Sequence, residues 1–218
     1  MDRIFTIGEY LIEDLVQHYH IPKEKVTPVG TGPGGISPYT GKKDYTIPTV
    51  LFVAKARFED KGGDLLLQAF KLAKKSLPKL RLIIVGQELD HFDKIDGLEI
   101  YGHVPFDQLK AFFAQSSLFA MPALNEPWGL VYLEAMLSKM PILGLRRNAI
   151  PEFTLNGQLG FMAEKPTPES VAETLVEAFR DTERLGKMGE MAQANVRNRY
   201  TWAHTVDSML AHMQLAQC

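Results

Sequence analysis

The sequence has 218 residues, of which 45% are apolar and 23% are charged. A chain of this length corresponds to one large domain or two small ones, and it can bury a core without disulfides or structural metals. Lysine and arginine total 24 against 26 aspartates and glutamates, which gives a net charge of −2. This balance argues against a dedicated nucleic-acid-binding protein, which would carry a strong basic excess.

The N-terminus and the cysteine content favour a reducing compartment. Asp2, Arg3 and Glu9 interrupt the apolar residues of the N-terminus, so we expect no signal peptide. No segment reaches the roughly 18 to 20 apolar residues needed to span a bilayer. The one cysteine, Cys218, is the last residue and cannot form a disulfide within the chain. We therefore expect a cytoplasmic, globular protein.

The first 48 residues predict a helix, a short strand and a long loop. Thr6 and Glu9 have the spacing of a capping box ahead of a helical apolar face, so a leading helix is expected within residues 1–24. Lys25 to Val29 could form a short strand. The stretch from Gly30 to Pro48 is rich in glycine and proline and is typical of a loop.

From residue 49 onward, short apolar runs alternate with amphipathic stretches. Strands are predicted at Thr49–Ala54, Leu80–Val85, Leu98–Tyr101, Leu118–Met121, Pro141–Leu145 and Leu159–Ala163. Helices are predicted at Asp64–Ser76, Phe106–Gln115 and Trp128–Ser138, and from Pro168 to Leu215 with breaks near Glu183 and Tyr200–Thr201. The alternation predicts an α/β fold with a doubly wound parallel sheet, Rossmann-like, as a single domain over residues 1–218. Ligands bind such sheets at the carboxyl ends of the strands, near the topological switch point.

Two cations follow the first of these strands. Arg57 and Lys61 lie in a loop that ends in Gly62 and Gly63, just before a predicted helix. Cations beside a helix N-terminus, with glycines that allow close backbone approach, suit a phosphate or diphosphate. Taken alone, the segment is more typical of a solvated loop with ordinary surface charges.

A second candidate anion site follows the strand at Leu118. Pro127 suits the first helical position, so the N–H groups of Gly129 and Leu130 are expected to point out of the helix end toward an anion. Glu126 lies at the mouth of this site, and Glu134 lies two turns further along the helix.

The spacing of these two carboxylates excludes a glycosidase pair. Eight residues of helix correspond to about 12 Å of rise. Retaining hydrolysis needs about 5 Å between the carboxyl groups, and inverting hydrolysis needs at most about 9.5 Å. We expect each carboxylate instead to accept hydrogen bonds from hydroxyls at opposite ends of an elongated ligand, with the phosphates of that ligand between them.

These segments resemble a known family. Glu126-x7-Glu134, within PALNEPWGLVYLEAM, is similar to the E-x7-E signature of the large family of retaining glycosyltransferases with the GT-B fold. VAKARFEDKGGDLLLQAF resembles the segment after the first strand of that family's second domain. Further similar segments follow in the family's order, so the resemblance covers the chain from about Thr6 to Leu210.

The resemblance implies the donor-binding half of an enzyme that uses a nucleotide-activated sugar. Arg57 and Lys61 would neutralise the diphosphate and stabilise it as it leaves, and with Glu126, which faces the donor sugar, they form the implied catalytic set. Gly129 and Leu130 would donate N–H groups to the phosphates, and Glu134 would accept from the ribose. The remaining implied donor-binding residues are Tyr101, His103, Val104 and Trp128. The residues from Tyr101 to Val104 would border the nucleobase chiefly through their backbone, although His103 is equally typical of an ordinary loop histidine.

The resemblance implies no metal and no further cofactor. It also implies an acceptor-binding domain ahead of the matched region, which would bind a glycan or a lipid-linked saccharide. Residues 1–24 and 201–218 would lie at the junction with that domain. We therefore expect the chain to bind a donor without transferring the sugar efficiently by itself.

The sequence departs from the family at two places. Lys139 stands where the family usually has a small residue, often glycine, and Arg146 to Ala149 replace a loop that tends to be glycine-rich.

Two other classes of function stay open. One is a non-catalytic module that binds a nucleotide sugar or a protein partner. The other, a dinucleotide-dependent oxidoreductase, is disfavoured, because Gly30 to Gly35 matches G-x-G-x-x-G but prolines rather than a helix follow it. A basic run on one predicted helix and its exit is usually a solvated face but could contact an anionic membrane surface; its members are Lys71, Lys74, Lys75 and Lys79.

Overall fold

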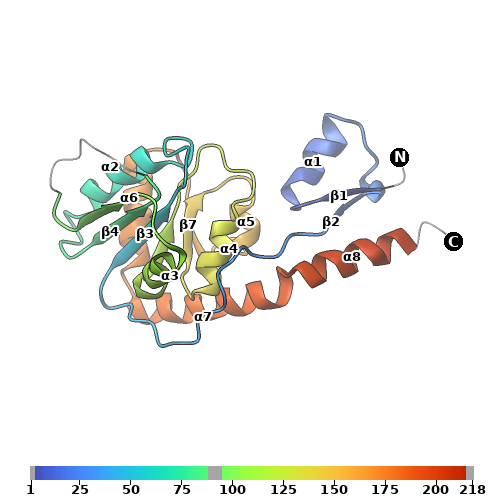
Figure 1. Cartoon of the computed structure of the whole chain (residues 1–218). Helices are drawn as coiled ribbons and strands as arrows, with labels where there is room; N and C mark the ends of the chain where they lie inside the picture. The colour runs from blue at the N-terminus through green and yellow to red at the C-terminus, as the bar shows by residue number, and fades with distance from the viewer. Residues whose placement is uncertain (1–2, 88–94, 215–218) are drawn as a thin grey trace.

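The computed structural model describes residues 3–87 and 95–214; Cys218 lies outside them. Within these residues, six parallel strands form one sheet in the order β5–β4–β3–β6–β7–β8 (Figure 1). The strands are β3 (Thr49–Val53), β4 (Arg81–Val85), β5 (Leu98–Tyr101), β6 (Leu118–Ala120), β7 (Ile142–Leu145) and β8 (Gly160–Ala163). The predicted doubly wound parallel sheet is confirmed.

The topological switch point lies between β3 and β6. Val50 of β3 pairs with Leu82 of β4 on one side and with Leu118 of β6 on the other. From β3 the chain builds outward through β4 to β5 and then returns to β6. The loops after β3 and β6 therefore emerge side by side, which is where a ligand binds in this architecture.

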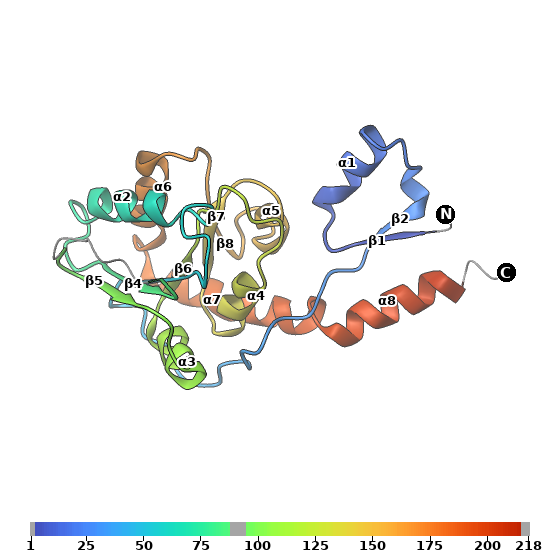
Figure 2. The same ribbon diagram turned by 45° about the horizontal axis from the view of Figure 1, so that its top comes forward.

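Helices cover both faces of the sheet (Figure 2). On one face, α2 (Gly63–Ala73) packs against α6 (Pro168–Ala178). The other face carries α3 (Phe106–Gln115) and α4 (Leu130–Leu137), and α7 (Thr182–Arg199) packs against α4. The short helix α5 (Ile150–Phe153) connects β7 to β8 and was not predicted.

The apolar side chains of the central strands form the core of the domain. Leu51, Phe52 and Phe119 are fully buried, because both faces of a parallel sheet are covered. The ring of Phe119 stacks on Phe113 with 6.5 Å between centroids and meets Tyr132 edge-on at 5.6 Å. Each such side chain contributes about 1.5–3 kcal/mol through burial alone.

The N-terminal residues form a small separate unit. Strands β1 (Ile4–Thr6) and β2 (Val26–Pro28) pair in parallel, and α1 (Tyr10–Gln17) and the single-turn 3-10 helix η1 (Lys23–Lys25) lie between them in the chain. We call this segment, residues 4–28, the N-terminal unit. Figures 1 and 2 show it beside the main sheet rather than joined to it.

The predicted capping box at the N-terminus is wrong. Thr6 ends β1, and its hydroxyl donates to the carbonyl of Gly8 rather than capping a helix. The helix begins only at Tyr10, and the side chain of its N-cap residue, Glu9, makes no capping hydrogen bond. The run Ile4–Thr6 pairs with β2 instead, a long-range contact that the local spacing does not reveal.

The stretch from Val29 to Pro48 contains no helix or strand, which confirms the loop predicted from Gly30 to Pro48, and it is attached to the main unit by hydrogen bonds. We call it the linker. The N–H of Tyr39 donates to the carbonyl of Leu137, and Lys43 is almost fully buried. Its ammonium donates to three carbonyls at the end of α3, those of Phe113, Ala114 and Ser116, at 2.7, 3.0 and 2.7 Å.

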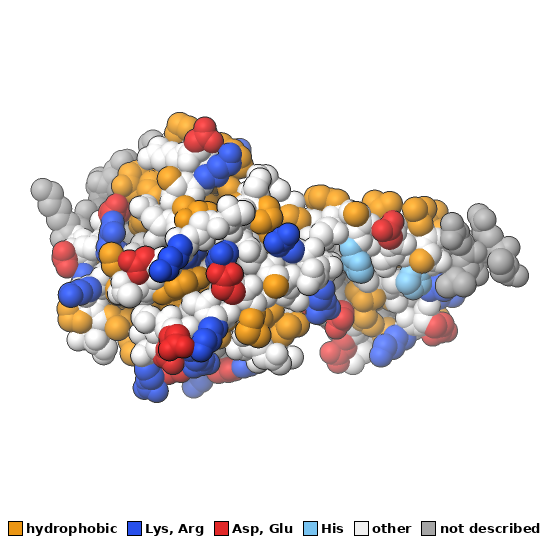
Figure 3. Space-filling model, turned by 90° about the horizontal axis from the view of Figure 1, so that it is seen from below, with side chains coloured by type: hydrophobic (Ala, Val, Ile, Leu, Met, Phe, Trp, Pro, Cys, Tyr) orange, Lys and Arg blue, Asp and Glu red, His pale blue; other side chains and the backbone are white. Residues whose placement is uncertain are grey.

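After α7 the chain continues as α8 (Trp202–Gln214), which extends away from the sheet toward the N-terminal unit (Figure 1). Four of its apolar side chains are about half exposed: Trp202, Val206, Leu210 and Met213. Figure 3 shows hydrophobic side chains along this arm. The predicted break at Tyr200–Thr201 is confirmed, and the earlier break lies at residues 179–181, where Asp181 caps α7.

No helix in the described ranges is both long and apolar enough to cross a membrane.

Candidate functional site

Three loops meet at the carboxyl end of the sheet: residues 54–62 after β3, 121–129 after β6 and 146–149 after β7. The carbonyl of Asp60 in the first loop accepts N–H groups of Leu124 and Asn125 in the second, at 2.8 and 3.1 Å. Gly62 has φ +78°, and a Cβ at this position would collide with the carbonyl of Pro122. Glycine is therefore required where the first two loops touch.

The predicted catalytic residues Lys61 and Glu126 lie in contact. The Lys61 ammonium is 3.7 Å from Oε2 of Glu126, and their side chains are only 21% and 17% exposed. Since the two residues are 65 positions apart in the chain, the fold rather than the local sequence joins them. This pair places one cation and one carboxylate at the switch point between β3 and β6.

Arg57 faces the same loop. Its Nε donates to Asp60 Oδ2 at 2.9 Å, and its Nη2 donates to the carbonyl of Asn125 at 3.2 Å. The residue has φ +60°, a conformation that non-glycine residues rarely adopt and that tends to occur at functional sites. Arg57 and Lys61 thus both approach the residues that lead into α4.

The N-terminus of α4 lies beside these cations. The helix begins at Leu130 with Gly129 as N-cap, so the prediction of Pro127 at the first helical position is wrong. Gly129 has φ +78°, and a Cβ there would lie 2.8 Å from the ring of Tyr132. The first N–H groups of a helix have no partner within it and favour an anion. The predicted backbone donors, Gly129 and Leu130, therefore stand at the helix start.

Glu134 is engaged by the linker. Its carboxylate accepts the N–H groups of Gly35 and Ile36, and burial raises its pKa although these hydrogen bonds oppose the shift. A Cβ at Gly34 would collide with the same carboxylate. The group that the resemblance assigns to a ribose thus has a partner within the chain.

Indole groups hold the same stretch of the linker. Trp128 Nε1 donates to Thr31 Oγ1 at 2.8 Å, and Trp202 Nε1 donates to the carbonyl of Pro33 at 3.2 Å. Trp128 is only 6% exposed and meets the ring of Phe153 edge-on, with 4.6 Å between centroids. Its side chain therefore serves packing and linker attachment, so only its backbone and a small part of the ring are left for the predicted donor contact.

The predicted nucleobase border lies after β5. The Tyr101 hydroxyl donates to Glu99 Oε2 at 2.9 Å, which raises the pKa of the tyrosine, and its ring lies 4.7 Å from that of Phe112. His103 is exposed, and Val104 is partly buried against the core. The side chain of Tyr101 is thus already engaged, and its backbone carbonyl accepts the N–H of Gly86 at 2.9 Å.

Two side chains that sequence reasoning did not assign complete the site. Asn148 Nδ2 donates to the carbonyl of Glu126 at 3.1 Å, and Arg147 Nη1 donates to the carbonyl of Leu124 at 3.1 Å. Asn148 has φ +50°, a conformation that asparagine tolerates better than most residues. An asparagine in a loop that is glycine-rich in similar proteins was the signal that could have pointed to it.

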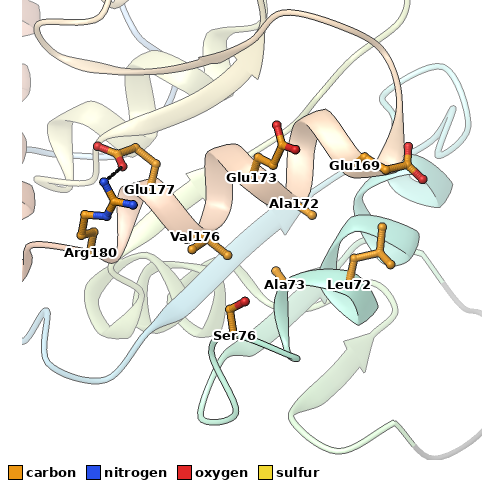
Figure 4. A pocket seen from close by; sticks show the side chains of 9 residues that line it. All are labelled: Leu72, Ala73, Ser76, Glu169, Ala172, Glu173, Val176, Glu177 and Arg180. Atoms are coloured by element: carbon orange, nitrogen blue, oxygen red, sulfur yellow. Dashed lines mark ion pairs between the residues drawn. The ribbon is translucent and has the colours of Figure 1, made fainter.

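A surface hollow elsewhere is unrelated to these loops. It has a volume of about 450 Å³, lies between α2 and α6, and is bordered by Glu169, Glu173 and Glu177 of α6 (Figure 4). Glu177 is paired with Arg180 at 3.2 Å. The hollow is on a helical flank and brings none of the predicted site residues together. In the described part of the chain, no group of three or more metal-ligating side chains is present.

The architecture defines a Rossmann-type α/β domain with cations, carboxylates and a helix N-terminus gathered at its switch point. Comparison with known families is more specific. The family model "Glycosyl transferases group 1" matches residues 41–195, and the chain belongs to this family.

Curated relatives are enzymes of about twice the length. The chain is 25% identical over 239 aligned positions to D-inositol 3-phosphate glycosyltransferase of Segniliparus rotundus, covering 99% of this chain and 52% of the relative. It is 28% identical over 185 positions to lipopolysaccharide 1,2-N-acetylglucosaminetransferase of Salmonella typhimurium, covering 76% and 48%. The chain thus spans about half the length of these relatives.

Solved structures confirm the fold. A glycosyltransferase from Rickettsia africae superposes with a TM-score of 0.78 at 16% identity, covering 99% of this chain and 64% of the other. The fold is therefore that of the corresponding part of GT-B glycosyltransferases.

Proposed function

We propose that this chain is the donor-binding half of a retaining glycosyltransferase and that it binds a nucleoside diphosphate sugar at the carboxyl ends of β3 and β6. The single observation that carries the proposal is the contact of Lys61 with Glu126 beside the start of α4. A cation, a carboxylate and free helical N–H groups at a switch point suit a ligand with both a diphosphate and hydroxyls.

In the proposed reaction, the bond between the sugar C1 and the diphosphate oxygen breaks, and the diphosphate leaves with the electron pair. A hydroxyl oxygen of the acceptor forms the new bond to C1, and the proton of that hydroxyl passes to the departing diphosphate. Arg57, Lys61 and the N–H groups of Gly129 and Leu130 stabilise the charge that develops on it. Because Lys61 is paired with Glu126 in the free chain, binding of the diphosphate would draw the ammonium away. Glu126 would then be free to accept a hydrogen bond from a hydroxyl of the donor sugar.

Ribose binding by Glu134 requires an exchange of partners. The N–H groups of Gly35 and Ile36 occupy its carboxylate in the free chain. A nucleoside would displace this part of the linker and offer its own hydroxyls instead.

The acceptor, a glycan or a lipid-linked saccharide, would bind to a further domain that corresponds to the part of the relatives not covered here. The N-terminal unit and α8 would face that domain, since α1 has no buried residue and four apolar side chains of α8 are about half exposed. Contact of the basic run with a membrane surface also stays a proposal, and Lys74 of that run is already paired with Asp96 at 2.7 Å.

The test is a calorimetric titration of the full chain with UDP, GDP and ADP. We expect one of the three to bind, and we expect Arg57→Ala and Lys61→Ala each to weaken that binding by about 10-fold or more, since charge-assisted hydrogen bonds contribute about 1.5–3 kcal/mol. Lys75→Ala, a matched loss of an exposed cation in the turn after α2, is the control and should change nothing. Absence of binding by all three nucleotides would contradict the proposal.

A further inference from the structure

The sheet order arranges the proposed donor site along a line. The strands follow one another as β5, β4, β3, β6 and β7. In the proposed function, on which this inference rests, the loop after β5 borders the nucleobase. The loop after β3 and the N–H groups of Gly129 and Leu130 hold the diphosphate, and Glu126 in the loop after β6 faces the sugar. The next loop, residues 146–149 after β7, therefore lies on the far side of the β6 loop from the loop after β3.

Side chains of this loop and of the loop after β3 both donate hydrogen bonds to the backbone of the loop after β6. Three consecutive carbonyls of residues 124–126 each accept from a different side chain. Leu124 accepts from Arg147 at 3.1 Å, Asn125 from Arg57 at 3.2 Å and Glu126 from Asn148 at 3.1 Å. Arg147 thus reaches the loop after β6 from the β7 side, whereas Arg57 reaches the neighbouring carbonyl from the β3 side.

The two arginines of the β7 loop differ in how their charges are balanced. Arg146 Nε lies 2.7 and 2.9 Å from the two carboxylate oxygens of Glu164, so its charge is compensated. Arg147 is exposed, and among the ion pairs of the described residues none includes it. A guanidinium has five N–H donors, and the hydrogen bond to Leu124 uses one.

We propose that Arg147 selects a donor whose sugar carries a carboxylate, that is, a nucleoside diphosphate hexuronic acid. The planar guanidinium matches a carboxylate through two parallel hydrogen bonds. A carboxylate on C6 projects from the part of the ring away from C1, where the diphosphate is attached. A neutral hexose would leave the charge of Arg147 with a carbonyl as its only protein partner among the described residues.

The test compares matched neutral and acidic donors by calorimetry on the full chain at constant ionic strength. The pairs are UDP-glucose with UDP-glucuronic acid and GDP-mannose with GDP-mannuronic acid. In the pair whose base the chain accepts, we expect the acidic donor to bind about 10-fold more tightly, which corresponds to about 1.4 kcal/mol. Arg147→Gln should bring this ratio close to one without weakening the free nucleotide, and Arg146→Gln should leave it unchanged. Arg147→Lys, which keeps the charge and loses the fork, should retain part of the preference.

Each contrary result has a distinct meaning. Equal affinity of the wild-type chain for the neutral and acidic donors would overturn this inference and leave the proposed function intact. Equal weakening of UDP and of both UDP-sugars by Arg147→Gln would also overturn it, because Arg147 would then belong to the diphosphate site. Absence of binding by every nucleotide would remove the proposed function itself.

Discussion

The main sheet and the N-terminal unit are both built from parallel strands with a helix between them, yet only one of them buries a core. In the main unit, β3 and β4 pair over five residues each, and most of their side chains are inaccessible to solvent. In the N-terminal unit, β1 and β2 pair over three residues, and α1 has no buried residue. A two-stranded sheet is marginal by itself, and parallel strands are normally covered on both faces.

The difference indicates which part of the chain has a complete hydrophobic core of its own. The proposed donor site rests on the part with a complete core, which can hold its loops in place without help. The N-terminal unit touches that part through Ile7 and Tyr10, which pack against the core, and through the N–H of Glu9, which donates to Glu152 Oε2 at 2.9 Å.

The largest expected difference in the free energy of unfolding is between two leucine-to-alanine variants, one in each region. Leu51→Ala in β3 should lower the free energy of unfolding by about 2–5 kcal/mol, since this side chain is fully buried. Leu15→Ala in α1 should cost less than about 1 kcal/mol, because Leu15 is only partly covered. Urea denaturation followed by circular dichroism measures both values. Equal costs would mean that the N-terminal unit shares the main core.

The next effect tests the linker, which connects the two regions. Lys43→Met leaves three carbonyls at the end of α3 without their donor. It should lower the free energy of unfolding by about 1–3 kcal/mol. Lys42→Met, at the exposed neighbouring position, should change the stability by less than about 0.5 kcal/mol.

The effect of Lys43 should also depend on pH. Burial, with a smaller contribution from Lys139, lowers the pKa of Lys43 from 10.5 to about 7. Between pH 7 and pH 10 the unfolded chain therefore binds more protons at this lysine than the folded chain does. The free energy of unfolding of the wild type should rise with pH across this window relative to Lys43→Met. A constant difference between the two would show that Lys43 keeps its proton in the folded chain, held by the three carbonyls.

Patterns within a short stretch of sequence predicted the main unit well and the N-terminal unit poorly. The bounds of β5 and α3 agree with the sequence prediction, because each is a continuous apolar or amphipathic run with clear flanking residues. Strand β1 has three residues and depends on β2, twenty positions later, so local spacing suggested a helix cap instead. Helix α5 has four residues, too few to show a period.

At the site, the residue types were predictable and their partners were not. The contact of Lys61 with Glu126 follows from parallel strands whose ends meet. The hydrogen bonds from the N–H groups of Gly35 and Ile36 to Glu134 join positions about a hundred residues apart. No pattern in the nearby sequence predicts them. The departures from the family at Lys139 and Asn148 have a conformational explanation. Both residues have positive φ, of 56° and 50°, so they adopt the backbone conformation that glycine would favour.

A smaller effect is expected where the linker meets Glu134. Gly34→Ala would place a Cβ against this carboxylate and should push the linker away, at a stability cost of about 1 kcal/mol. If Glu134 serves the ribose, the same change should strengthen nucleotide binding a few-fold, because the competing N–H groups have already left. Gly35→Ala, whose Cβ would instead approach the ring of Phe106 at 3.2 Å, is the matched control. Weaker binding by Gly34→Ala alone would mean that the linker supports the nucleotide rather than competing with it.

The smallest effect is expected on α8, and it contrasts two valines in successive helices. Val196 in α7 is fully buried, so Val196→Ala should cost about 1–2 kcal/mol, whereas Val206 in α8 is 51% exposed and Val206→Ala should stay within about 0.5 kcal/mol. Because Val206 lies in an apolar stripe that is about half exposed in the described part of the chain, Val206→Asp should also leave the fold intact while reducing concentration-dependent self-association in sedimentation experiments. If Val206→Asp instead unfolded the chain, α8 would belong to the main core, and the contrast between a complete sheet and an open periphery would no longer hold.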